Sequence, residues 1–187
     1  TSAETLFRKR DFPAALLELD SARSIQPKNS QILSLSARCY VEMRAFPQAL
    51  QLLHEADEIS PNNPTILFNI GEMQFVTKQW KKAIASFEGV TKLTKPEQTE
   101  LRDLIEFKIL LCHAGLENRE EFSQRAASIP AANDTLRNYF TKAVVEFESN
   151  NEEQANKLLA DAERAFPQLQ DRAPWVDTLT EFGYSPR

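Results

Sequence analysis

The fold of this chain is decided by one stretch, SQILSLSARCYVEMRAFPQALQLLHEADEISPNN, at positions 30–63. Its apolar and small residues recur at helical spacing, and Pro61 ends the second helical segment because proline lacks the amide hydrogen that a helix needs. The next stretch of equal length, PTILFNIGEMQFVTKQWKKAIASFEGVTKLTKPE at 64–97, repeats the pattern. Each stretch is therefore expected to form a helix, a turn and a second helix.

Shifting the sequence by one such period, from position 30 to position 64, brings similar side chains into register across three copies. The aligned columns are small (Ala3, Ala37 and Gly71; Ala15, Ala49 and Ala83), aromatic (Phe12, Phe46 and Trp80) and aliphatic (Leu16, Leu50 and Ile84). A small residue at each period marks a place where two helices cross closely, and the aromatic column fills the space beside it. The columns thus predict stacked helical hairpins.

Working outward, residues 1–29 look like a copy that lacks its first positions, and residues 136–169 form a further recognisable copy. The segment between them, 98–135, is degenerate and four residues longer than one period, which is about one helical turn. A long apolar stripe from 98 to 116 places that turn in the first helix of the segment, and Asn118 with Glu121 predicts the cap of a shorter second helix. A capping helix is expected at about 173–183, opened by Pro174 and ended by Gly183.

These columns resemble the tetratricopeptide repeat family, whose period of about 34 residues equals the offset between the two stretches. The resemblance implies an all-α fold, a right-handed α-solenoid of about five helix-turn-helix hairpins plus the C-terminal capping helix. It implies one domain over 1–187, with repeats at approximately 1–29 (truncated), 30–63, 64–97, 98–135 (degenerate) and 136–169. In this family the first helices of successive hairpins line a concave groove that binds a partner.

Composition and charge exclude several function classes. The chain has 22 Lys and Arg against 27 Asp and Glu, and its net charge of −5 gives no reason to attract nucleic acid. No apolar run is long enough to cross a bilayer, so no direct membrane insertion is expected. The visible chain is expected to be soluble, with a cytoplasmic location favoured. A periplasmic or secreted location after removal of a leader stays open, because the sequence starts at Thr1.

Cys39 and Cys112 have no metal-ligand spacing and are expected to be reduced packing residues.

The resemblance carries over a set of groove positions. They are Phe7, Arg38, Val41, Phe68, Asn69, Glu72, Phe75, Phe140, Val144 and Phe147. The five phenylalanines among them are not required for packing within a hairpin, and an exposed apolar stripe usually marks a binding surface. The alternative for Phe75 and Phe147 is that they replace the core aromatics missing at Gln74 and Glu146. A clamp for C-terminal carboxylates, known in the family, is not expected, since only Arg38 and Asn69 suit it.

The function that follows is a protein–protein interaction scaffold or adaptor that binds a peptide or an amphipathic helix of another protein in the groove. Two alternatives remain open: a chaperone similar to the class II chaperones of type III secretion, and a self-assembling scaffold that binds its own copies. An enzyme is not expected, because the sequence offers no nucleophile–base pair, no Gly-rich phosphate loop and no metal set. No cofactor is expected either.

Overall fold

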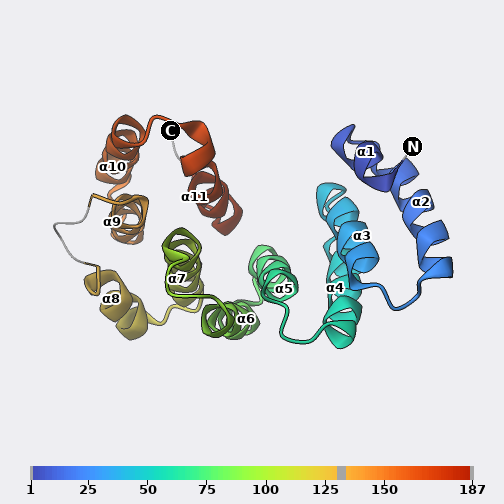
Figure 1. Ribbon diagram of the computed structural model, residues 1–187. Coiled ribbons are helices and arrows are strands. Elements are labelled where there is room, and N and C mark those ends of the chain that lie inside the picture. Colours follow the sequence, from blue (N-terminus) through green and yellow to red (C-terminus); the bar gives the residue numbers. More distant parts are fainter. Residues whose placement is uncertain (1, 130–133, 186–187) are drawn as a thin grey trace. The chain divides into compact units, whose positions relative to one another are not determined.

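A computed structural model describes residues 2–129 and 134–185, and these residues form helices, turns and no strands (Figure 1). The helices are α1 (Ala3–Arg8), α2 (Phe12–Ile25), α3 (Ser30–Glu42), α4 (Phe46–Ile59), α5 (Pro64–Val76), α6 (Trp80–Leu93), α7 (Thr99–Gly115), α8 (Arg119–Ala127), α9 (Leu136–Glu148), α10 (Glu152–Ala165) and α11 (Leu169–Phe182). The first ten pair as consecutive hairpins, which confirms the all-α repeat architecture. Residues 130–133 of the fourth predicted repeat lie outside the described residues.

The chain divides into two compact units. The first contains residues 1–77 and 85–93, and the second contains residues 78–84 and 94–187. The prediction of a single domain stays a prediction.

The small columns of the sequence lie where helices pack. Ala15, Ala49 and Ala83 are completely buried, and so are Ala143 and Ala155 in the last hairpin. The aromatic column begins the second helix of each of the first three hairpins, since α2, α4 and α6 start at its members. The residues that recur with the repeat period in the sequence are therefore the residues that pack between helices in the structure.

Polar side chains and special backbone angles set the helix ends. Asn29 and Asn63 accept hydrogen bonds from the first amides of α3 and α5. The residue at each turn within a hairpin adopts a left-handed conformation with φ between 55° and 62°: Arg10, Arg44, Lys78, Glu117 and Asn150. The first three of these are spaced by one period of the repeat, so the turn recurs with the sequence pattern.

The fourth hairpin contains the predicted irregularity. Helix α7 has 17 residues, whereas α3, α5 and α9 each have 13. Helix α8 has only 9 residues, and the Asn118 side chain accepts from the Glu121 amide as the sequence predicts. The four extra residues therefore extend the first helix of this hairpin.

Helix α11 differs from its prediction at the N-terminal end. It begins at Leu169, so Pro174 lies inside the helix instead of opening it. The proline removes one hydrogen bond to the carbonyl of Gln170, an exposed residue that water can reach. Burial of Trp175 and Leu179 on the following turns holds the helix together past this point.

Candidate functional site

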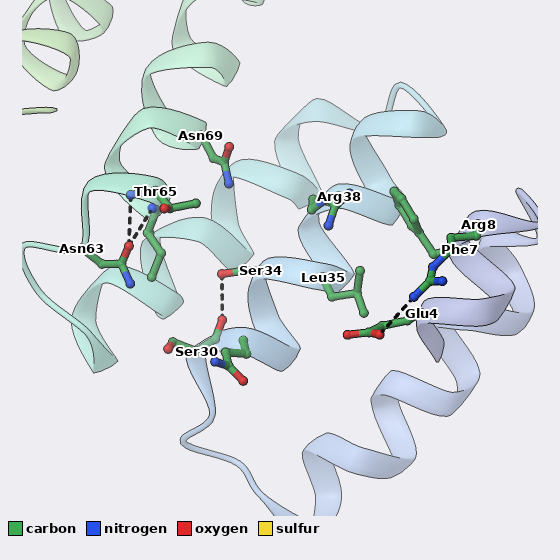
Figure 2. A pocket seen from close by; sticks show the side chains of 12 residues that line it. Glu4, Phe7, Arg8, Ser30, Ser34, Leu35, Arg38, Asn63, Thr65 and Asn69 are labelled. Atoms are coloured by element: carbon green, nitrogen blue, oxygen red, sulfur yellow. Dashed lines mark hydrogen bonds and ion pairs between the residues drawn. The ribbon is translucent and has the colours of Figure 1, made fainter. Parts of the chain in front are cut away.

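A groove of about 680 Å³ runs across the first helices of the first unit (Figure 2). Its walls come from α1, α3 and α5, the first helices of three successive hairpins. The lining residues are Glu4, Phe7, Arg8, Ser30, Gln31, Ser34, Leu35, Arg38, Asn63, Thr65, Ile66 and Asn69. This volume lies within the range of about 300–1,000 Å³ that is typical of ligand sites.

The repeat period brings these side chains to one face. Gln31 lies one period before Thr65, and Leu35 lies one period before Asn69. Because successive hairpins repeat the same geometry, side chains one period apart project from equivalent places on neighbouring helices. The groove is therefore a direct result of the sequence register.

Arg38 is held in the groove by an aromatic ring. Its guanidinium carbon lies 4.5 Å from the centroid of the Phe7 ring, and Phe7 itself packs edge-on against Phe12 at 5.5 Å. A cation over an aromatic face is attracted to the ring by about 0.5–1 kcal/mol at exposed sites. The stacked guanidinium makes no hydrogen bond or ion pair within the described residues, so its N–H groups remain available.

The other polar side chains differ in whether their hydrogen bonds are already used. Ser34 donates to the Ser30 carbonyl at 2.7 Å, and Asn63 caps α5 through the amides of Thr65 and Ile66. The carboxamide of Asn69 has no hydrogen-bond partner in the described part of the chain, and Figure 2 shows it projecting from α5 on the groove side. Arg38 and Asn69 thus offer free donors and an acceptor beside the apolar side chains of Leu35, Ile66 and Phe7.

Three of the predicted groove residues, Phe7, Arg38 and Asn69, line this groove. Four others in the same unit, Val41, Phe68, Glu72 and Phe75, do not. Val41 packs against the core beside α4, the Phe68 ring lies 5.9 Å from that of Phe87, and Glu72 is half-buried.

Phe75 lies in the core, as the alternative interpretation of the sequence predicted. Its side chain is 0% exposed, so it fills the space of the missing core aromatic. The adjacent Gln74 is also buried, where its Oε1 accepts from Ser86 Oγ at 2.8 Å. Both residues are turned inward, and the expectation that Phe75 is available to a partner is wrong.

The predicted groove residues of α9 are buried or stacked against other aromatic side chains. Phe140 is 1% exposed, and the Trp175 ring lies 5.6 Å from its ring. Val144, one helical turn further along, is completely buried, and Phe147 is stacked by Tyr184 at 4.6 Å. The expectation of an open groove is wrong at Phe140 and Val144, which are buried, and α11 packs on α9 instead of only closing the end of the stack. Phe147 is half-buried.

Most of the polar residues that line the groove were not among the predicted groove residues. Gln31 and Thr65 stand at an equivalent position of the repeat, and so would have followed from the register of the groove positions. Glu4 and Arg8 come from the truncated first copy and form an exposed ion pair at 3.6 Å. Within the described residues, no cluster of three or more His, Cys, Asp and Glu side chains is placed to hold a metal ion.

Comparison with known proteins gives the family of these repeats. Residues 47–94 match the model of YpiA-like tetratricopeptide repeats. The segment from α4 to α6 therefore matches tetratricopeptide repeats. No curated protein sequence matches it.

The solved structures that resemble this chain share its fold. The crystal structure of MamA has a TM-score of 0.66 at 14% identity and covers 91% of this chain and 90% of its own. The crystal structure of YrrB, described as a TPR protein with an unusual peptide-binding site, has a TM-score of 0.64 at 16% identity, covering 91% and 86%. At these identities the likeness of the tetratricopeptide structures concerns the fold alone. In the described parts of this chain, no helix combines the length and apolarity of a membrane span.

Proposed function

We propose that this tetratricopeptide protein is an interaction scaffold that binds an extended peptide segment of a partner protein in the groove between α1, α3 and α5. The proposal is supported chiefly by Arg38 and Asn69, whose polar groups face the groove without a hydrogen-bond or ion-pair partner in the described residues. An extended peptide offers unpaired backbone amides and carbonyls, which a carboxamide can bond with both its donor and its acceptor.

The apolar side chains of the groove favour a peptide with at least one apolar anchor. Leu35 and Phe7 are half-buried, so each still presents part of its surface to an incoming side chain. Burial of apolar area provides affinity, and a few polar contacts fix the orientation of the ligand. An acidic residue next to the anchor would meet the Arg38 guanidinium, which is already oriented by Phe7.

The proposal is tested by selecting peptides from a random display library on the full chain and measuring their affinity for variants. Arg38→Glu and Asn69→Ala are both expected to weaken binding, and Arg38→Glu by about tenfold or more, since one lost charge-assisted hydrogen bond is worth roughly 1.5–3 kcal/mol. Arg119→Glu is the matched control, because Arg119 is exposed in the first turn of α8 and does not line the groove.

Binding that survives both groove substitutions would show that the peptide site lies elsewhere on the protein. Loss of binding with Arg119→Glu to the same degree would show that net charge, and not the groove, determines the affinity.

A further inference from the structure

A cavity of about 500 Å³ lies within the second unit. Its walls come from the N-terminal parts of α7, α9 and α11 and from the end of α10. The cavity shares no lining residue with the groove between α1, α3 and α5. Its volume lies in the range that is typical of ligand sites, so it is a second place at which this protein can hold a ligand.

The charged side chains that line this cavity are mainly acidic. Glu100, Asp103, Asp134 and Asp171 supply four carboxylates, and among the described lining residues only Arg137 supplies a cation. The Arg137 guanidinium is already paired with Asp103, its Nη1 lying 3.2 Å from the Asp103 Oδ1. A concave site with an excess of one charge attracts a ligand of the opposite charge. The cavity therefore favours a cation.

Two of these carboxylates are available to a ligand. Glu100 and Asp171 are exposed, and neither side chain makes a hydrogen bond or an ion pair in the described parts of the chain. Asp134, in contrast, accepts a hydrogen bond from the Tyr139 hydroxyl at 2.6 Å. The neighbour of Asp171 in sequence, Arg172, is engaged elsewhere, since its Nη2 lies 2.8 Å from a Glu163 carboxylate oxygen.

A purely structural role explains each of these two carboxylates separately. Acidic residues in the first turn of a helix interact favourably with the helix dipole, and Glu100 and Asp171 stand in the first turns of α7 and α11. Glu152 and Glu153 have the same place in α10, but they do not line this cavity. The dipole does not account for the fact that carboxylates from two different helices meet at one cavity.

The apolar part of the lining is largely aromatic. Phe166 is half-buried, and the nearly buried Trp175 adds a smaller exposed part beside Leu136. The Phe166 ring is held edge-on by Tyr139 at 6.3 Å, and the Trp175 ring lies 5.6 Å from that of Phe140. Aromatic rings attract cations, and a planar guanidinium also stacks on them. The rings thus favour the same class of ligand as the carboxylates.

We propose that this cavity binds an arginine side chain of a partner protein, with its guanidinium paired to Glu100 and Asp171 and packed against Phe166. Arginine suits the site better than lysine because its planar fork of donors can bond two carboxylates and is more weakly hydrated. The cavity is larger than one guanidinium, so it also accommodates residues that flank the arginine. The proposal does not depend on the function proposed for the groove of the first unit.

The test selects peptides from a random display library on the full chain carrying Arg38→Ala/Asn69→Ala, which removes the polar groups of the first groove. We expect arginine-containing peptides, each of which is then synthesised with citrulline or lysine in place of the arginine. Citrulline keeps the shape but has no charge, and should weaken binding at least about tenfold. Lysine should weaken it about threefold. A selection without arginine, or equal binding of the citrulline or lysine peptide, would overturn the proposal.

Two receptor variants locate the site. Glu100→Gln/Asp171→Asn removes two charges at nearly constant size and should weaken the selected peptides at least about tenfold. Glu152→Gln/Glu153→Gln is the matched control, because it removes two exposed first-turn carboxylates of α10 outside the cavity. It costs the same kind of helix-dipole interaction, but peptide affinity should stay within about twofold of the parent. An equal loss in both variants would show that net charge recognises the peptide, and would overturn the proposal.

Nuclear magnetic resonance reports the place of binding directly. The indole N–H resonance of Trp175, assigned by its absence from Trp175→Phe, should shift when a selected peptide is added to the parent receptor. A bound peptide that leaves this resonance and the amides of Glu100 and Asp171 unchanged would place the site elsewhere. Failure of the function proposed for the first groove has a different signature, since it concerns peptides that depend on Arg38 and Asn69.

Discussion

Gly71 of α5 lies so close to Phe87 of α6 that a Cβ atom on the glycine would stand 2.7 Å from Phe87 Cε1. Phe87 is completely buried, so its ring has little room to withdraw. This contact explains why the small column of the repeat, which is alanine in the preceding copies, becomes glycine in this one.

Gly71→Ala is accordingly expected to lower the free energy of unfolding, even though alanine favours a helix over glycine by about 1 kcal/mol. Overpacking of a core costs about 1–3 kcal/mol, which exceeds that gain. Chemical denaturation of the full chain measures the change. Gly89→Ala is the comparison, since its Cβ would meet the flexible end of Leu67, which is only half-buried, and we expect the smaller loss there.

Gln74 and Ser86 are expected to behave as a coupled pair. Gln74→Leu should destabilise the protein by about 1–3 kcal/mol, because it leaves the buried Ser86 hydroxyl without the oxygen that accepts its hydrogen bond at 2.8 Å. Adding Ser86→Ala should recover most of that loss. A double-mutant cycle from denaturation curves measures the coupling, and additive single effects would show that the bond contributes nothing.

The left-handed turn residue Lys78, with φ of 59°, is expected to be replaceable by glycine with a gain in stability. The left-handed conformation costs a residue with a side chain about 1–2 kcal/mol, which outweighs the greater entropy of glycine in the unfolded chain. Lys81→Gly changes an equally charged, exposed residue in the first turn of α6 and should instead destabilise, by up to about 1 kcal/mol. The two melting temperatures should therefore shift in opposite directions.

Tyr184 makes the attachment of the C-terminal segment sensitive to alkaline pH. Burial raises the pKa of its phenol above the ordinary value of 10, and its hydroxyl also donates a hydrogen bond to Glu148. Because the folded-state pKa is raised, the stability from this contact is fully present below about pH 10, and it is lost as the pH rises above that value toward the folded-state pKa.

The measurement is the unfolding free energy between neutral pH and about pH 11, compared with Tyr184→Phe, which keeps the ring stacked on Phe147 but has no titrating hydroxyl. The wild type should lose more stability than the variant over this range. An equal loss of unfolding free energy in the wild type and in Tyr184→Phe would contradict the role assigned to the Tyr184 hydroxyl.

The sequence was sufficient to predict the hairpins, because helix packing depends on columns of small and aromatic residues that one chain displays several times. The burial of Ala15, Ala49 and Ala83 could be predicted from the sequence pattern alone. The extra turn of α7 could also be predicted, since four added residues shift every later column by the same amount.

Whether each groove position is exposed or covered could not be predicted in the same way. Phe68 and Phe140 occupy equivalent positions of the repeat, but only Phe140 is covered by a tryptophan, Trp175, which comes from beyond the last repeat. A periodic pattern describes what each hairpin presents to its neighbours, and it contains no information on where a non-repeating segment such as α11 returns to pack.

The longer α7 also shifts the register of every hairpin that follows it. A template that advances in steps of one fixed period stays in register through α6 and is displaced by about one helical turn at the fifth hairpin. The match to tetratricopeptide repeats ends at residue 94, and α7 begins at Thr99. The downstream hairpins nevertheless keep the same packing, since their small residues Ala143, Ala155 and Ala162 are as deeply buried as those upstream.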